Sequence, residues 1–204
     1  MSERLFIQGP AGRLQAIYQP GDAHKPAVVV CHPHPLYGGT MNNKVVYWIA
    51  QTFRQHGCTV LRFNFRGVDD SEGSWDNGVG ETDDARAALA WLHAQHPAAP
   101  LWLAGFSFGC YAGLRAAHDD QRVTRLFAVA PAVNHYDFSF MQEDTRPLTV
   151  VIGTRDEIVP FDDVQRWSRT LPEVRFHALA NAGHFFPDHK QELLAVLAND
   201  AFKP

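Results

Sequence analysis

The stretch Leu101-Trp-Leu-Ala-Gly-Phe-Ser-Phe-Gly109 decides the fold, because an apolar run passes directly into a turn that has a glycine on either side of Ser107. The apolar run predicts a buried β-strand, and residues 108–117 predict a helix. A strand, a sharp turn and a helix in this order lift the serine hydroxyl clear of the sheet, and the small glycines let strand and helix approach closely. We therefore predict that Ser107 is a nucleophile rather than an incidental turn residue.

The rest of the chain alternates short apolar runs with helical patterns. This alternation is typical of an α/β fold with a mostly parallel, twisted sheet and helices on both faces. Strands are expected at 5–8, 14–19, 27–31, 59–63, 101–104, 126–130, 148–152 and 174–178. Helices are expected at 46–53, 85–92, 108–117, 164–171 and 190–198. We therefore predict a sheet of about seven to eight strands in a single domain that spans residues 1–204.

Composition excludes several classes of protein. The 204 residues are 46% hydrophobic and 20% charged, with a formal net charge of −4, as is usual for soluble globular proteins. There is no basic run for nucleic acid, and no stretch approaches the ~18 apolar residues of a membrane span. The first residues lack the pattern of a signal peptide, and three scattered cysteines fit reduced thiols. We expect a cytoplasmic monomer or small homo-oligomer whose partner is a small molecule.

Two later loops supply partners for the serine. A serine hydroxyl is a poor nucleophile until a base takes its proton, and the base needs a third group to orient it. Asp156 follows the strand expected at 148–152, and His184 follows the last strand. Ligands bind at the carboxyl ends of strands in such sheets. We predict that His184 is the base and Asp156 its orienting acid, with Asp137 as the rival acid.

The loop from Cys31 to Asn43 is expected to help stabilise an oxyanion. Acyl transfer needs hydrogen-bond donors aimed at the charge that develops on the substrate oxygen. The first donor is the backbone N–H of Phe108, directly after the serine. For the second donor we favour the N–H of Leu36, because Pro33 and Pro35 have none, and His34 is the alternative.

The same loop also contains two candidate metal ligands. His32 and His34 are two residues apart on an extended segment, so both side chains can face one way. A catalytic zinc needs at least one further ligand, and the chain has no H-E-x-x-H pattern and no matching cysteine pair. We therefore expect no metal and no cofactor.

With these residues placed, the chain resembles the α/β-hydrolase superfamily along nearly its whole length. More narrowly, it is similar to a bacterial group of small, lidless hydrolases of carboxylesterase or dienelactone-hydrolase-like type. The shared pattern comprises the loop 32–43, Phe63-Asn-Phe-Arg-Gly67 with Ser71-Glu-Gly73, Gly105 to Gly109, Gly153-Thr-Arg-Asp156 and Gly183-His184. The resemblance implies an α/β-hydrolase fold, the triad of Ser107, Asp156 and His184, and oxyanion donors at Leu36 and Phe108.

One position departs from that pattern. After Arg66-Gly67-Val68 the group usually has a second glycine, and Asp69 stands there in this chain. The departure affects the expected shape of this loop but not the triad. We assign Arg66 no catalytic role and expect it to hold the loop through a salt bridge.

The segment 131–147 is too short for a lid of several helices, so an open and shallow site is expected. Of the aromatic residues near its rim, Tyr37, Phe106 and Phe185 are predicted to contact substrate, which favours an apolar acyl group. We predict a serine carboxylesterase that cleaves short- to medium-chain acyl esters through an acyl-enzyme. The alternatives are a thioesterase, peptidase or lactonase on the same site, or a ligand-binding protein without catalysis.

Overall fold

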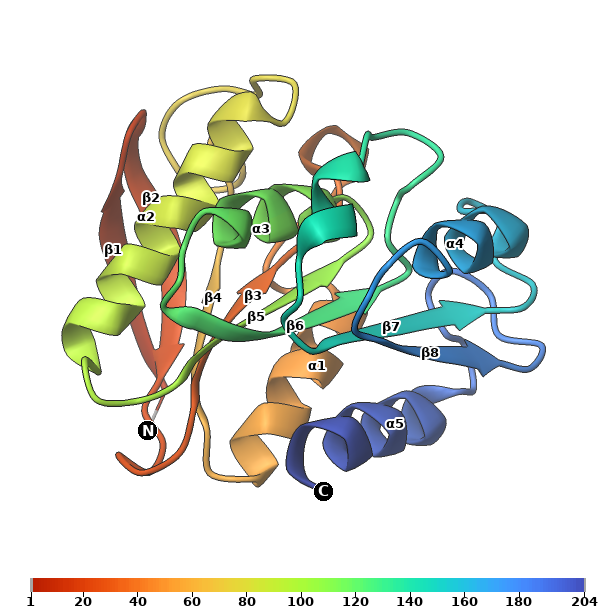
Figure 1. The fold of residues 1–204 in the computed structure, drawn as a ribbon. Coiled ribbons are helices and arrows are strands. Elements are labelled where there is room, and N and C mark those ends of the chain that lie inside the picture. The colour runs from red at the N-terminus through yellow and green to blue at the C-terminus, as the bar shows by residue number, and fades with distance from the viewer. Residues whose placement is uncertain (1, 204) are drawn as a thin grey trace.

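The computed structural model describes residues 2–203, which form an eight-stranded sheet with helices on both faces (Figure 1). The strands lie side by side in the order β1-β2-β4-β3-β5-β6-β7-β8. They are β1 (Glu3–Gly9), β2 (Gly12–Gln19), β3 (Ala27–Cys31), β4 (Thr59–Phe63), β5 (Leu101–Phe106), β6 (Val123–Val129), β7 (Leu148–Gly153) and β8 (Val174–Leu179). β2 pairs antiparallel with both β1 and β4, and all other pairs are parallel. The predicted mostly parallel α/β sheet is confirmed.

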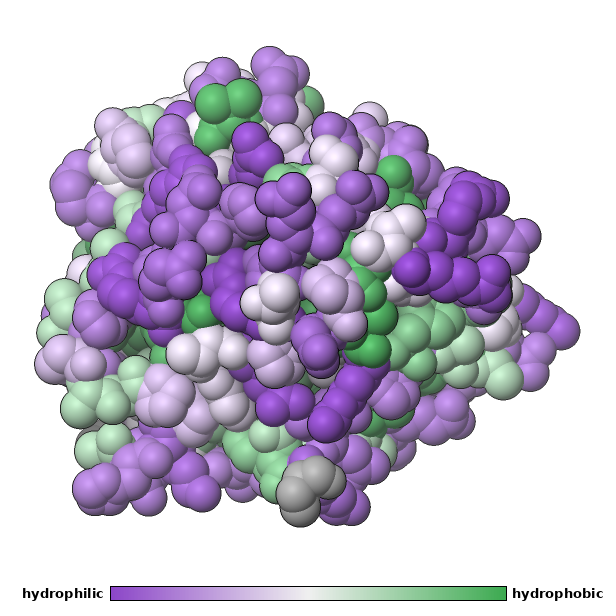
Figure 2. Space-filling view, in the orientation of Figure 1, coloured by the Kyte–Doolittle hydropathy of each residue, from purple (hydrophilic) through white to green (hydrophobic). Residues whose placement is uncertain are grey.

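Five α-helices cover the two faces. They are α1 (Lys44–Gln55), α2 (Val79–Gln95), α3 (Phe108–His118), α4 (Phe161–Ser168) and α5 (Lys190–Phe202). α1 and α5 pack against each other below the sheet, and α2 and α3 pack against each other above it (Figure 1). No helix within residues 2–203 has the length and apolar character needed to cross a membrane. The face drawn in Figure 2 is mostly hydrophilic, with hydrophobic residues scattered over it.

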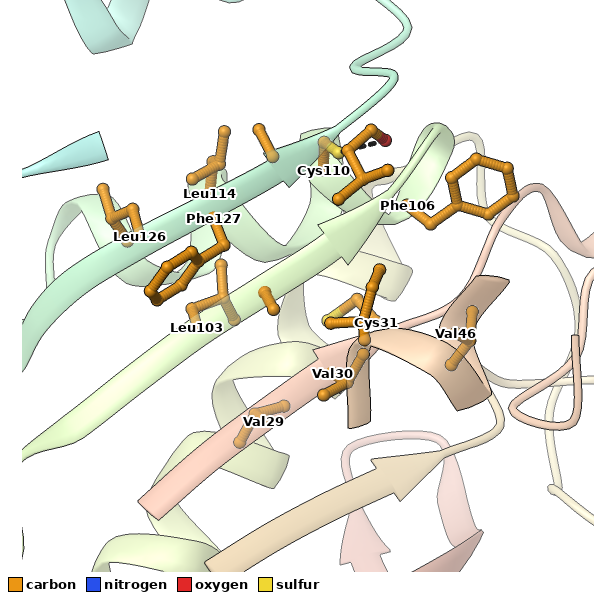
Figure 3. Close-up of a cluster of buried hydrophobic side chains, with 14 of the residues drawn as sticks. Val29, Val30, Cys31, Val46, Leu103, Phe106, Cys110, Leu114, Leu126 and Phe127 are labelled. Atoms are coloured by element: carbon orange, nitrogen blue, oxygen red, sulfur yellow. Dashed lines mark hydrogen bonds between the residues drawn. The ribbon is translucent and has the colours of Figure 1, made fainter. Parts of the chain in front are cut away.

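The core lies between the central strands and their helices. Every residue of β3 and of β5 is buried, as the continuous apolar runs predict for strands covered on both faces. Figure 3 shows side chains of β3, β5 and β6 together with Val46 of α1 and Cys110 and Leu114 of α3. The backbone of α3 lies very close to that of β3, since a Cβ on Gly109 would lie 2.5 Å from the Cys31 carbonyl oxygen.

The connection between β6 and β7 contains no lid. Within it the described chain forms only the short 3₁₀ helix η2 (Ser139–Glu143). The predicted fold without a lid domain is therefore confirmed. The carboxyl ends of β5, β7 and β8 point to the same edge of the sheet, because these strands are parallel. Loops that follow them are brought together there.

The loop after β4 is tied to α2 by a buried ion pair. Arg66 donates from Nη2 to Asp84 Oδ1 at 2.7 Å and from Nε to Asp84 Oδ2 at 3.0 Å, which confirms the expected salt bridge. Asp69, at the departure from the usual glycine, has φ 47°. Aspartate tolerates this left-handed conformation better than most residues, and its carboxylate accepts from Asn64 Nδ2 at 3.0 Å. The aspartate thus keeps the turn that a glycine would make.

Candidate active site

Ser107 lies on a strained turn between β5 and α3. Its backbone has φ 55° and ψ −119°, a region that costs energy for a residue with a side chain and that is found at functional sites. The Ser107 N–H donates to the Val129 carbonyl at 2.9 Å, and its own carbonyl accepts from Cys110 N–H at 3.0 Å. The surrounding backbone therefore holds the turn in place, and the serine side chain lines a cavity of about 290 Å³.

Asp156 and His184 form a buried pair. His184 Nδ1–H donates to Asp156 Oδ2 at 2.8 Å, and both side chains are almost fully excluded from solvent, at 2% and 0% exposure. The other carboxylate oxygen, Oδ1, accepts from the N–H groups of Ile158 and Val159 at 2.9 and 2.8 Å. Three donors thus lock the carboxylate. Because Nδ1 carries the proton that Asp156 accepts, Nε2 of the neutral ring is free to act as a base.

Glu157 holds the histidine loop from the other side, and sequence reasoning missed it. Its Oε2 accepts from the backbone N–H of His184 at 3.0 Å. The sequence gives one indication of this role, because Glu157 is a second carboxylate directly after Asp156. Asp156 and Glu157 together fix the ring and the backbone of His184.

The structure brings together Asp156 and His184 but does not join them directly to Ser107. Within residues 2–203 the serine hydroxyl forms no hydrogen bond to His184, whose Nδ1 faces Asp156. The His184 ring packs on Phe106, the residue before Ser107, with ring centroids 5.0 Å apart. Catalytic hydrogen bonds are often long without substrate and tighten when it binds.

Asp137, the rival acid, lies elsewhere. It is exposed, its Oδ1 accepts from Ser139 N–H at 2.8 Å, and it lines a separate cleft beside Trp167. The backbone hydrogen bond from Ser139 holds its pKa below the usual range. Asp156 is therefore the acid that accompanies His184.

Of the three aromatic residues expected to contact substrate, one lines the cavity. Tyr37 does so and is highly exposed. Phe106 is fully buried and forms a wall behind His184. Phe185 is half-buried and meets His184 edge-on at 5.1 Å, outside the cavity lining. The alternation of side chains along β5 turns Phe106 into the core, so the Phe106 side chain is not available to substrate.

The oxyanion loop departs from the expectation for Leu36. Residues Pro35–Tyr37 form a 3₁₀ turn, η1, and the side chain of His34 caps it by accepting from Leu36 N–H at its Nδ1, 3.2 Å away. The favoured donor is thus already engaged. His34 itself lines the same cavity as Ser107 and Phe108. The N–H of Phe108, in the first turn of α3, has no partner within the helix, as is usual there.

His32 is a core histidine. Its side chain is fully buried, Nε2 accepts from Phe65 N–H at 3.0 Å, and Nδ1–H donates to the Pro33 carbonyl at 2.6 Å. Burial lowers its pKa to about 3. Both ring nitrogens are occupied, so His32 and His34 do not form a joint metal site. Among residues 2–203 no cluster of three or more metal-ligating side chains is present.

Comparisons with known proteins identify relatives that share the sequence and fold of this chain. The sequence pattern of the α/β-hydrolase fold matches residues 26–144. An uncharacterised protein of Rickettsia prowazekii is 39% identical over 208 residues, covering 97% of this chain and 87% of that protein. A structure described as an α/β serine hydrolase homologue from Coxiella burnetii is 40% identical with a TM-score of 0.91, covering 97% of this chain and 96% of that one.

A further similar structure, from Xanthomonas campestris, is described as an α/β serine hydrolase without a lid. It is 39% identical with a TM-score of 0.90, and the likeness covers 98% of this chain and 93% of that chain. The short connection between β6 and β7 in this chain is consistent with that likeness. On the strength of the sheet order, the serine turn and these likenesses, the chain belongs to the α/β-hydrolase family.

Proposed function

We propose that this protein is a serine carboxylesterase that hydrolyses short- and medium-chain acyl esters, with Ser107 as nucleophile, His184 as base and Asp156 as orienting acid. The observation that carries the proposal is the buried hydrogen bond from His184 Nδ1 to Asp156, next to Phe106 and the strained serine turn. A strained backbone and a pre-oriented imidazole each cost stability, and the chemistry of acyl transfer accounts for both.

The proposed reaction has two halves. Ser107 Oγ attacks the ester carbonyl carbon while its proton passes to His184 Nε2, and the protonated ring then gives that proton to the departing alcohol. A water molecule then attacks the acyl carbon of the acyl-enzyme and loses a proton to the same nitrogen. The ring passes that proton to Ser107 Oγ as the bond from Oγ to the acyl carbon breaks and the carboxylic acid leaves. Asp156 remains ionised throughout and stabilises the imidazolium that forms in each half.

For the oxyanion we propose the backbone N–H groups of Phe108 and His34. Phe108 N–H lies at the positive end of the α3 dipole, which favours negative charge. His34 replaces Leu36 as the second donor, because the Leu36 N–H is taken by the His34 ring. The cavity that contains Ser107 is lined by both residues.

The size of the site supports small substrates. A cavity of about 290 Å³ lies at the lower end of the range for small-molecule sites, and no lid encloses it. We propose that the protein acts in the cytoplasm as a monomer or small homo-oligomer, in keeping with three buried cysteines that form no disulfide.

The decisive experiment is covalent labelling with a fluorophosphonate probe, followed by turnover of 4-nitrophenyl esters of increasing chain length. Wild type should be labelled and should prefer short and medium chains, and Ser107→Ala should lose both labelling and turnover. Ser139→Ala is the matched control, because Ser139 is exposed on η2 away from His184, and it should behave as wild type. Labelling that persists in Ser107→Ala would remove the serine from its proposed role.

A further inference from the structure

The cavity beside Ser107 has a mostly apolar lining with a few hydrogen-bond donors. Besides Ser107, four of its side chains bear N–H or O–H groups, namely His34, Tyr37, His135 and Tyr136. In the part of the chain that the structure describes, no Asp or Glu lines this cavity. A carboxylate placed here would find donors and no like charge on the walls. Hydrogen bonds to an ionised acceptor are about twice as strong as neutral ones.

His34 is held as a donor that faces outward from its turn. Its ring packs against Tyr37, Trp75 and Phe108, with centroids 4.6, 4.4 and 5.2 Å away. Burial and the neighbouring His135 lower the pKa of His34, so the neutral ring prevails. Since Nδ1 accepts from Leu36 N–H, the single proton of the neutral ring lies on Nε2. That N–H has no partner among residues 2–203 and is free to bind substrate.

His135 and Tyr136 supply further donors from the loop after β6. His135 lines the same cavity as His34, so one bound anion can contact both rings. The Tyr136 ring packs on Tyr111 and Phe108 at 4.6 and 5.3 Å. Burial, with smaller contributions from Tyr37, Glu81 and Tyr111, raises the pKa of Tyr136 to about 12, so its hydroxyl keeps its proton.

Two acids on neighbouring segments, Glu81 and Asp137, do not compete for these donors. Glu81 is buried, and its two oxygens accept from the N–H groups of Asp76 and Gly78 at 3.0 and 2.8 Å. Asp137 accepts from Ser139 N–H and belongs to the separate cleft beside Trp167. The donors in the cavity are therefore left for a ligand.

We propose that this site selects esters that carry a carboxylate close to the scissile bond, which the His34 Nε2–H and the His135 ring bind, with Tyr136 beside them. The inference rests on the proposed esterase function and gives it a substrate class. His34 and His135 act as specificity-determining residues through their side chains, whereas the backbone N–H of His34 has its own role at the oxyanion.

Two matched pairs of esters test the inference, because the carboxylate could belong to either half of the ester. For the acyl half, mono-4-nitrophenyl glutarate is compared with 4-nitrophenyl pentanoate, which has the same number of acyl carbons. For the alcohol half, 4-acetoxybenzoate is compared with its methyl ester. Each kcat/KM is corrected for spontaneous hydrolysis. It is then divided by the rate constant for hydrolysis of the same ester by hydroxide, which removes differences in intrinsic reactivity between the two esters. We expect a preference of about tenfold or more for the carboxylate in one pair, the size of one charge-assisted hydrogen bond.

Two variants connect the preference to the two histidines. His34→Phe and His135→Phe keep an aromatic ring and remove its N–H, so the ratio of the two kcat/KM values should fall toward one in each. The ratio, unlike either rate, is insensitive to a general loss of active protein. His24→Phe is the control, since His24 is an exposed residue of the turn before β3, and it should leave the ratio unchanged.

The outcomes separate the two proposals. Labelling at Ser107 without a carboxylate preference in either pair overturns the inference and leaves the esterase function standing. A preference that survives in both Phe variants also overturns it, because the histidines would then not be the cause. Neither labelling nor turnover of any ester overturns the esterase function and the inference together.

Discussion

At the scale of single residues, the sequence predicts the site residues whose positions follow from the order of strands along the chain. It does not predict the site residues whose positions depend on the conformation of a loop. Ser107, Asp156 and His184 each follow a strand at one edge of the sheet, so their positions could be predicted from the alternating pattern. Their catalytic roles stay a prediction. The second oxyanion donor depends on a hydrogen bond from Leu36 N–H to a side chain two residues earlier, which no periodicity reveals. Phe106 was expected to contact substrate, but every residue of β5 is buried, so the apolar run does not reveal which way each side chain points.

The proposed role of His184 as base makes a prediction about the pH dependence of activity. A protonated His184 cannot take the proton of Ser107, and imidazole side chains generally change charge between about pH 5 and 8. We therefore expect kcat/KM to fall as the pH is lowered from 8 to 5, measured on a neutral 4-nitrophenyl ester. A rate that is constant across this range would show that another group serves as base.

His32 makes stability depend on pH. Its pKa is about 3 in the folded protein against an ordinary value of 6.5, because burial disfavours the charged ring. Between these values the unfolded chain binds a proton that the folded chain does not, so stability falls as the pH falls from 6.5 toward 3. The contribution is about 1 kcal/mol per pH unit.

Urea unfolding at several pH values between 7 and 4 measures this effect. His32→Gln should flatten the slope of unfolding free energy against pH relative to wild type. His24→Gln, at an exposed position, should retain the wild-type slope. Equal slopes for all three proteins would contradict the assignment of His32 as an acid-sensitive core residue.

At the scale of elements, the central strands could be predicted from the sequence, because burial on both faces favours a continuous run of apolar residues. The expected 27–31 and 59–63 coincide with β3 and β4. α2 begins at Val79, ahead of the apolar repeat at 85–92 that predicts it, because its first turns are buried through polar partners rather than apolar contact. Glu81 binds two backbone N–H groups and Asp84 binds Arg66, so both are buried although neither is apolar. The spacing of apolar residues therefore does not reveal that these two acidic residues belong to the helix.

The contact between α3 and β3 depends on Gly109. A helix favours alanine over glycine by about 1 kcal/mol, but a Cβ here would lie 2.5 and 2.6 Å from the carbonyl oxygens of Cys31 and His32. Backbone atoms in a central strand cannot move aside as a flexible side chain can. The overlap therefore prevails, and Gly109→Ala should lower the unfolding free energy by about 2 kcal/mol.

Gly38→Ala is an informative comparison in the same urea titration. Gly38 has φ 76° and open space around its Cβ position, so its cost comes from backbone strain alone, about 1 kcal/mol. A Gly109→Ala protein as stable as wild type would show that strand and helix separate more easily than their packing indicates.

At the scale of the whole molecule, the Arg66–Asp84 pair joins the loop after β4 to the helix layer. Its side chains are 10% and 0% exposed, so each charge depends on the other. Arg66→Met leaves the buried Asp84 carboxylate without its ion-pair partner and should cost about 3–5 kcal/mol. Asp84→Leu leaves Arg66 only the exposed Asp76 at 3.9 Å and should cost less. The double variant should cost less than the sum of the single ones, because it leaves no charge behind.

Asp83→Asn disrupts an exposed ion pair and is the comparison for the Arg66 and Asp84 variants. Asp83 pairs with Arg86 at 2.6 Å, but both side chains are more than two-fifths exposed. Exposed ion pairs contribute at most about 1 kcal/mol, so this change should be small. Strict additivity of Arg66→Met and Asp84→Leu in thermal or urea unfolding would mean that the two charges do not depend on each other.

The short connection between β6 and β7 also has a kinetic consequence. With no helical cap over the serine turn, reactant and product exchange with bulk solvent without waiting for a slow opening motion. Turnover should then follow the concentration of dissolved ester alone and show no abrupt rise when the ester forms droplets. The molecule is suited to solutes rather than to lipid–water boundaries.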